Sequence, residues 1–155
     1  NGPKEDAIAA FLGFARDRLQ QLGVPVSVSV YPVIAREDYK DSALIGQELE
    51  KMAANVDVVC PLVYPSHYAK DAYGLDDPGA HPYELTASVL KEFAAGIAGT
   101  EATARPWLQA FGLGSTPYAA AEIQAEIEAA ADAGSKGWAL WNPKGEYPAD
   151  AFAPE

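Results

Sequence analysis

Aromatic, amide and guanidinium side chains recur in or just after the apolar segments of this sequence. The residues that we predict to bind a substrate are Tyr64, His67, Arg105, Trp107, Gln109, Trp138, Trp141 and Asn142. Aromatic faces can cover the apolar C–H face of a pyranose, and amide or imidazole groups can bond its hydroxyls. Because all three tryptophans fall in the last two apolar segments, we interpret the set as a sugar-binding surface rather than core filler.

Carboxylates are scarce at the same positions. Cleavage of a glycosidic bond usually needs two of them, roughly 5 to 9 Å apart. Glu37, Asp38 and Asp41 follow the first apolar strand, and Glu146 follows the last one. Glu37 is the best candidate for a catalytic acid in this chain, although a solvated charged loop is the simpler interpretation of its surroundings.

Other kinds of site have weak signals or none. His67, His81 and Cys60 lack the spacing of a metal site, and no glycine-rich phosphate loop or nucleophile elbow occurs, so we expect no metal and no cofactor. The chain has 11 basic and 22 acidic residues, and this balance argues against nucleic acid and anionic membranes as partners. No apolar run approaches the ~20 residues of a membrane span.

Helical and strand patterns alternate along the chain. Helices are predicted over 8–22, 45–53 and 82–97, and a fourth carries Ile123, Ile127 and Ala130 after a Thr116-Pro117 start; strands are predicted over 24–30, 56–64, 105–111 and 137–141. Strict alternation predicts parallel strands joined by right-handed crossovers. Residues 148–155 are expected to form a flexible tail.

Two architectures share this pattern, namely a small doubly wound sheet and part of a (β/α)₈ barrel. A complete barrel typically needs ~250 residues, so four strands would be half of one. The first helix has no strand before it. We therefore expect residues 1–155 to be a partial barrel, completed by an N-terminal half upstream of Asn1. A self-sufficient four-stranded α/β binding domain remains the alternative.

Three stretches of the chain resemble one bacterial family. They are residues 45–68, which include Val-Tyr-Pro-Ser-His-Tyr, residues 104–111, which include Arg-Pro-Trp-Leu-Gln, and residues 137–143. The family comprises (β/α)₈ domains of the glycoside hydrolase type with no assigned function, distantly similar to chitinase-like and polygalactosaminidase-like barrels. The resemblance extends from about Asp6 to Tyr147, and it implies that the strands are the fifth to eighth of a TIM barrel.

The resemblance also implies what the chain does. It implies a parent protein that hydrolyses a polysaccharide, with its main catalytic carboxylates on the fourth strand, before this chain begins. The expected partners are a carbohydrate and the N-terminal half of the barrel, and a polymeric substrate favours a secreted or cell-envelope location. Ala110 stands where the family often has Asp. The segment Ser29-Val30-Tyr31-Pro32 stands where relatives often carry Asp-Val-Phe-Gly, so each departure removes a carboxylate. Both departures favour the alternative of a non-catalytic carbohydrate-binding barrel.

Overall fold

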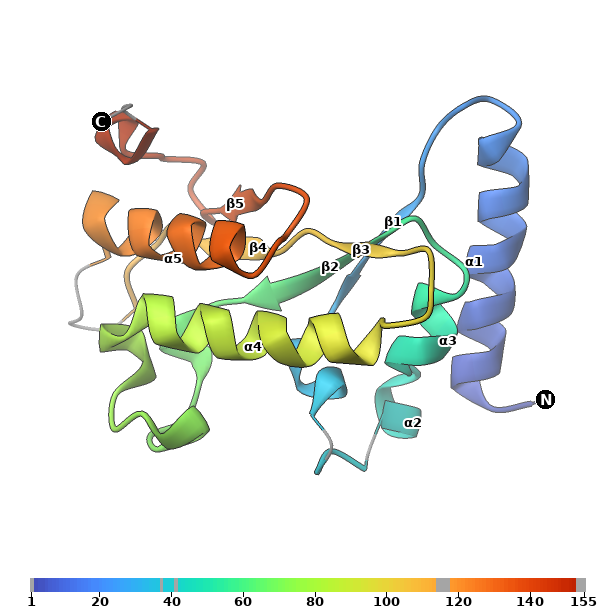
Figure 1. Cartoon of the computed structure of the whole chain (residues 1–155), viewed down its shortest axis with the longest axis horizontal. Helices are drawn as coiled ribbons and strands as arrows, with labels where there is room; N and C mark the ends of the chain where they lie inside the picture. The colour runs from blue at the N-terminus through green and yellow to red at the C-terminus, as the bar shows by residue number, and fades with distance from the viewer. Residues whose placement is uncertain (1, 37, 41, 114–117, 153–155) are drawn as a thin grey trace. The chain divides into compact units, whose positions relative to one another are not determined.

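Helices and parallel strands alternate along the chain, as Figure 1 shows. The computed structural model describes residues 2–36, 38–40, 42–113 and 118–152. Contacts group the chain into two compact units: residues 1–62 with 92–105, and residues 63–91 with 106–155. None of the described helices is long and apolar enough to cross a membrane.

The first unit contains three parallel strands, β1 (Ser27–Val30), β2 (Val58–Val63) and β3 (Thr103–Ala104). β2 lies between the other two: Ser27 aligns with Val58 on one side, and Thr103 aligns with Val58 on the other. Most residues of β2 are buried, which explains its nearly continuous apolar sequence.

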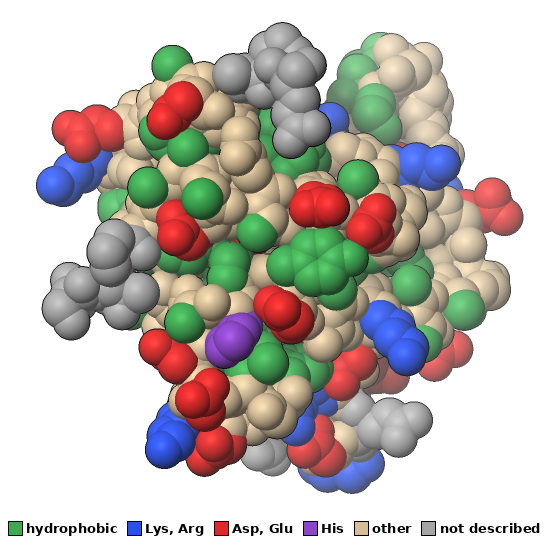
Figure 2. Space-filling view, turned by 60° about the vertical axis from the view of Figure 1, so that its left-hand side comes forward, with side chains coloured by type: hydrophobic (Ala, Val, Ile, Leu, Met, Phe, Trp, Pro, Cys, Tyr) green, Lys and Arg blue, Asp and Glu red, His purple; other side chains and the backbone are tan. Residues whose placement is uncertain are grey.

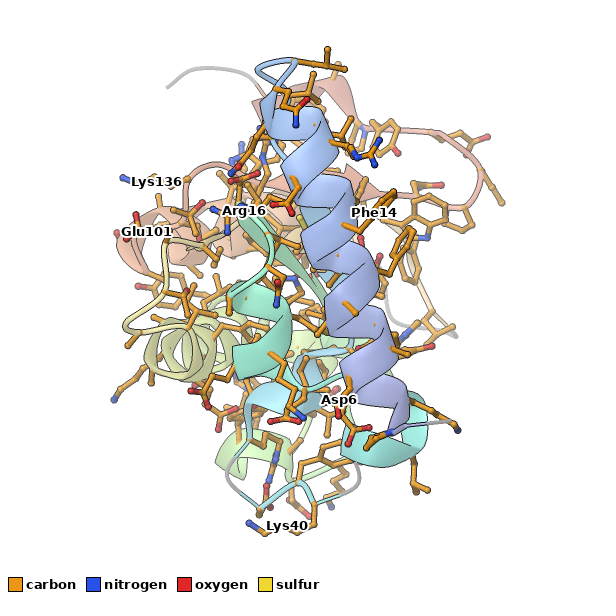
Figure 3. The ribbon with its side chains drawn as sticks, turned by 90° about the vertical axis from the view of Figure 1, so that its right-hand side faces the viewer. Asp6, Phe14, Arg16, Lys40, Glu101 and Lys136 are labelled. Carbon is orange, nitrogen blue, oxygen red and sulfur yellow. The ribbon has the colours of Figure 1, made fainter. Side chains whose placement is uncertain are left out.

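Helix α1 (Lys4–Gln20) packs against α2 (Ser42–Ile45) and α3 (Leu49–Ala53) in this unit (Figure 1). Leu12 is its buried contact residue, whereas Phe11 and Phe14 are 65% and 58% exposed. Figure 3 shows Phe14 pointing away from the helix on the side opposite Arg16. The predicted apolar stripe included Phe11 and Leu22, and both side chains are exposed instead.

An ion pair between partly buried side chains connects α1 to the residue before β2. Arg16 lies 3.3 Å from the carboxylate of Asp57, and that carboxylate also accepts a hydrogen bond from the backbone N–H of Val26 at 2.7 Å. Asp57 thereby joins the helix, the segment before β1 and the segment before β2.

The predicted helix over 45–53 is divided into α2 and α3 at Gly46. Gly46 has a φ of 72°, a left-handed conformation that disfavours residues with a Cβ. A Cβ at this position would also lie 2.8 Å from Cδ1 of Ile8 and 3.0 Å from Cβ of Lys4. The interruption thus brings the chain against α1 at a point where no side chain fits.

The second unit contains the parallel pair β4 (Trp107–Gln109) and β5 (Ala139–Trp141), with residues 82–91 of α4 (Pro82–Gly96) and all of α5 (Ala120–Asp132). Leu108 packs against Leu90 of α4 and Ala130 of α5. Because side chains alternate along a strand, Trp107 and Gln109 lie on the face of β4 opposite Leu108. One face of the strand pair is therefore covered by helices.

Several boundaries differ from the predicted ones. Within the strand expected over 105–111, only β4 at 107–109 is strand; β3 ends at Ala104, before that range, and Pro106 between the two has no N–H to donate to a ladder. Helix α4 confirms the helix predicted over 82–97. The Thr116-Pro117 start predicted for the following helix lies outside the described residues. Within the expected tail, residues 149–152 form a 3₁₀ helix, η5 (Ala149–Phe152), which packs on α5. Further 3₁₀ turns are η1 (Pro32–Ala35), η2 (Pro65–His67), η3 (Ala72–Gly74) and η4 (Pro78–Ala80).

We predict that Gly46→Ala destabilises the protein more than Gly23→Ala does. Gly23 has a similar φ of 69°, but no atom lies within 4 Å of its virtual Cβ. Each substitution should cost about 1 kcal/mol from the left-handed backbone, and crowding should add roughly 1–3 kcal/mol at Gly46. Urea denaturation of both variants would measure this difference, and equal midpoints would contradict the proposed crowding.

Candidate functional site

Gln109, in the second unit, joins the carboxyl end of β4 to the turn that follows β2. Its side chain is fully buried. Oε1 accepts a hydrogen bond from the backbone N–H of Ser66 at 3.0 Å, and Nε2 donates to Oγ of Ser66 at 2.8 Å and to the carbonyl of Phe111 at 2.7 Å. A buried amide satisfied in this way fixes the two segments against each other.

Tyr64, His67 and Phe111 form an aromatic triad on these two segments. The ring centroids are 5.4 Å apart for Tyr64–His67, 5.5 Å for Tyr64–Phe111 and 5.7 Å for His67–Phe111, all edge to face. Burial raises the pKa of Tyr64 to about 12, so its hydroxyl stays protonated at neutral pH. His67 is exposed. The triad thus presents an imidazole on an apolar base, which is suitable for hydrogen bonding to a ligand.

Trp107 and Trp141 form a second aromatic group, on the strand face opposite Leu108 and Leu140. Their ring centroids are 6.3 Å apart at an interplanar angle of 90°. Trp141 is 47% exposed. The structure therefore brings these two predicted residues together on neighbouring strands.

Trp138 does not share the strand face of this pair, and Arg105 belongs to the other unit. Trp138 packs against the cluster of Leu90 and Leu108 and stacks on Phe152 at 6.2 Å. It belongs to the helix-covered side, so we leave it out of the binding surface that we propose below. Arg105 belongs to the first unit, where it is exposed and its backbone N–H donates to the carbonyl of Val59.

Asn142 shapes the loop after β5. Its Nδ2 donates to the carbonyl of Ala110 and its Oδ1 accepts from the backbone N–H of Lys144 at 2.8 Å. A pocket of about 540 Å³ opens beside it, lined by residues 110–112, 118–119, 142–144 and 146–148. Among the described residues that line it, Lys144 and Glu146 carry charge. The sequence analysis did not assign Lys144 or the aromatic wall residues Tyr118 and Tyr147 to a site.

The candidate acid Glu37 lies outside the described residues. Its neighbours Arg36 and Asp38 form a two-bond ion pair, with N–O distances of 2.9 and 2.8 Å. The hydrogen bond from Arg36 holds the pKa of Asp38 below its usual value. Asp38 is thereby an ionised partner of Arg36 in an exposed loop.

Glu126 is a buried carboxyl group that the sequence analysis did not identify. Within the described part of the chain, Thr86, Gln109 and Glu126 are the polar side chains that are fully buried. Burial raises the pKa of Glu126 well above its ordinary value, and the Tyr118 hydroxyl, the Gln109 N–H and the Thr86 hydroxyl oppose part of that shift. No described group makes a regular hydrogen bond to either carboxyl oxygen, so these donors act at less than ideal geometry.

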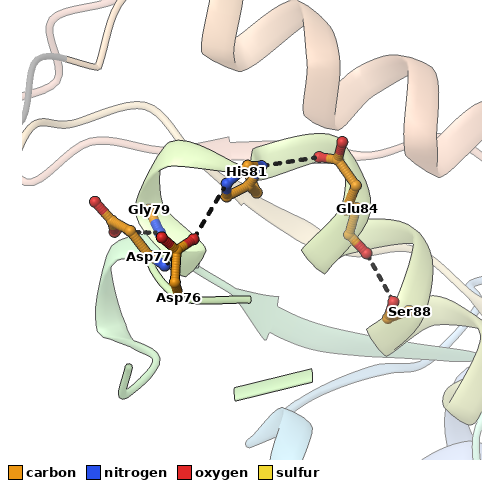
Figure 4. Close-up of polar contacts among 6 residues, drawn as sticks. All are labelled: Asp76, Asp77, Gly79, His81, Glu84 and Ser88. Atoms are coloured by element: carbon orange, nitrogen blue, oxygen red, sulfur yellow. Dashed lines mark hydrogen bonds and ion pairs between the residues drawn. The ribbon is translucent and has the colours of Figure 1, made fainter. Parts of the chain in front are cut away.

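The second histidine, His81, lies beside exposed carboxylates (Figure 4). Its Nε2 is 3.6 Å from Asp76, and its Nδ1 is 4.0 Å from Glu84. Asp77, the residue after Asp76, accepts a hydrogen bond from the backbone N–H of Gly79.

Acidic side chains also lie in several places on the face drawn in Figure 2, with apolar side chains between them. The described residues contain no group of three or more acidic, histidine or cysteine side chains that could hold a metal ion.

Glu126 should make the stability of the protein depend on pH. Above about pH 4.5 the unfolded chain loses the Glu126 proton while the folded protein keeps it. The free energy of unfolding should therefore fall as pH rises towards the raised pKa, by up to about 1.4 kcal/mol per pH unit from this group. Glu126→Gln should remove that part of the slope in denaturant titrations. Glu128→Gln, at an exposed position of the same helix, is the control; identical slopes in the two variants would contradict the prediction.

One of three comparisons with known proteins supports the glycoside-hydrolase-like part of the resemblance. A family model described as "Putative glycosyl hydrolase domain" matches residues 1–147. No curated protein and no solved structure gives a significant match. The match covers nearly the whole chain and includes every element of the second unit up to β5, so the chain belongs to this glycosyl hydrolase domain family.

Proposed function

We propose that this chain forms the sugar-binding part of a carbohydrate-active barrel that hydrolyses a glycosidic bond in a polysaccharide. The observation that carries the proposal is the pair Trp107 and Trp141, which share the face of β4 and β5 opposite Leu108 and Leu140 and leave Trp141 47% exposed. Indole faces that stay partly exposed offer the apolar contact that a pyranose ring needs. A hydrophobic core would instead have buried both rings.

Polar groups in the same unit provide the hydrogen bonds that such a ligand also requires. His67 is exposed on the aromatic triad, and Lys144 and Glu146 line the pocket beside Asn142. Ligands of parallel α/β folds bind at the carboxyl ends of strands, where these residues lie. We infer that Tyr64, His67 and the pocket bind hydroxyl groups while the tryptophans contact a ring.

The half-barrel proposal rests on strand pairing and on the uncovered face. In the described part of the first unit, β1 pairs with β2 along one edge, and no strand pairs with its other edge. In the described part of the second unit, β5 pairs with β4 along one edge, and no strand pairs with its other edge. Parallel strands are usually covered on both faces, and open edges are usually protected. Further strands of a barrel would meet both requirements, and we propose an N-terminal half of the same barrel as their source.

A non-catalytic carbohydrate-binding domain is the second candidate. Among the described residues that line the pocket, Glu146 is the one carboxylate, and Ala110 occupies the end of β4. Hydrolysis by the usual mechanism needs two carboxylates on one bond. Under our first proposal the main catalytic carboxylates come from the other half of the barrel, with Glu37 as the candidate from this chain; under the second, the protein lacks them.

Trp141→Ala in the full-length protein should weaken binding of a soluble oligosaccharide. Loss of one aromatic contact should cost about 1.4 kcal/mol, a roughly tenfold rise in Kd. Phe152→Ala is the matched control, since Phe152 is also 47% exposed but stacks on Trp138. Calorimetric titration with neutral, acidic and N-acetylated oligosaccharides would supply the affinities. Equal losses in the two variants would contradict the binding surface.

Hydrolysis should respond to Glu37 and Glu146 in different ways. We expect Glu37→Gln to lower kcat for release of reducing ends by roughly 100-fold, the usual cost of losing an acid or base. Glu146→Gln should raise KM with little change in kcat, because we place this residue in ligand binding. A wild-type protein that binds oligosaccharides but releases no product would favour the non-catalytic candidate. Unchanged kcat in Glu37→Gln would remove Glu37 from the mechanism.

A further inference from the structure

The connection from β2 to α4 is a long loop over residues 64–81, with only short 3₁₀ turns of its own (Figure 1). Backbone hydrogen bonds from Gly74 to Asp71 and from Ala80 to Asp77 close turns within it. Connections of more than about 12 residues are uncommon in compact domains, and those that keep a defined structure are usually functional. This loop also follows the carboxyl end of a parallel strand, where ligands of α/β folds bind.

The far end of the loop folds back onto the turn that carries His67. Turn η4 packs on η2, and a Cβ at Gly79 would lie 3.4 Å from Oγ of Ser66. Ser66 is also bound by the side chain of Gln109, which shares a face of β4 with Trp107. The loop is therefore anchored at the end of the strand face that carries the tryptophans.

Tyr68 and Tyr73 form an aromatic pair in this loop. Their ring centroids are 6.0 Å apart at an interplanar angle of 61°, and both side chains are half-buried. Tyr68 directly follows His67, and its backbone N–H donates to the carbonyl of Pro65 at 3.2 Å. The pair thus adjoins the aromatic triad and keeps part of its surface in contact with solvent.

The backbone at Tyr73 has a conformation that disfavours tyrosine. Its φ is 56° and its ψ is 22°, in the left-handed region, which bulky residues rarely adopt because it costs free energy. Glycine or asparagine would occupy this position at lower cost. Strain of this kind persists mainly where a side chain is needed for a ligand, so the tyrosine at this position indicates a use for its ring.

We propose that Tyr68 and Tyr73 form a further carbohydrate subsite, which binds an additional sugar ring of an extended chain through aromatic contact. Partly exposed phenol rings offer the apolar surface that the C–H face of a pyranose needs. This inference rests on the proposed function, because it adds one binding position to the same surface. A carbohydrate chain held by Trp107 and Trp141 would reach the tyrosine pair by extending past the aromatic triad.

The test compares two ligand lengths in the full-length protein. Calorimetric titration uses a disaccharide and a hexasaccharide from the neutral, acidic or N-acetylated series that the wild type binds. We expect Tyr73→Gly to raise the Kd of the hexasaccharide roughly 2- to 10-fold and to leave that of the disaccharide unchanged, since only the longer chain reaches the pair. Tyr73→Phe, which keeps the ring, should bind both ligands as the wild type does.

Asp71→Gly is the matched control. Asp71 lies in the same loop with a φ of 65°, so this substitution relieves a similar backbone strain without removing a ring, and both affinities should stay unchanged. If Tyr73→Gly fails to fold, Tyr73→Asn takes its place with the same expected result, because asparagine also tolerates the left-handed region.

Three results would overturn the subsite while leaving the proposed function intact. They are unchanged hexasaccharide binding in Tyr73→Gly, an equal loss for the disaccharide and the hexasaccharide in that variant, and an equal loss in Asp71→Gly, which would show a general response of the loop. A wild-type protein that binds no oligosaccharide of either length would instead refute the proposed function, and the subsite with it.

Discussion

The buried amide of Gln109 is the interaction on which the candidate site depends. An amide removed from water costs free energy unless its donor and acceptor are both used, and here they are used by Ser66 and Phe111. Ser66 lies 43 residues from Gln109 in the chain. The requirement to satisfy one side chain therefore fixes where the turn after β2 meets the end of β4, and the edge-to-face geometry of Tyr64, His67 and Phe111 follows from it.

The alternation of side chains along β4 and β5 decides which residues are available to a ligand. Leu108 and Leu140 face the helices, where they pack with Leu90 and Ala130. Trp107 and Trp141 lie on the other side, where Trp141 is 47% exposed. Burial of apolar surface drives folding only where there is a partner to bury it against. A large aromatic pair left on a strand face thus indicates a ligand or a further part of the fold, and the family assignment favours a carbohydrate-active protein.

The sequence predicted the parallel α/β arrangement and most helices because their patterns are local. It placed Trp138 with Trp141 in one site, although the parity of the strand puts Trp138 with Leu140 on the helix side. The contact of Gln109 with Ser66 depends on tertiary structure, which no local pattern contains. Glu126 did leave a signal, since it falls on the same helical stripe as Ile123 and Ala130, but its full burial depends on tertiary packing. Glu37, the predicted acid, lies outside the described residues.

The two buried polar groups of the second unit differ in a way that bears on function. The amide of Gln109 is fully satisfied, so its burial can be neutral or favourable for stability. The carboxyl of Glu126 lacks regular hydrogen bonds and costs stability where an apolar side chain would not. Selection for folding alone accounts for the first group but not for the second. Glu126 is fully buried on α5, and Tyr118, which precedes that helix, lines the pocket beside Asn142, so the cost of this buried acid arises close to the candidate site.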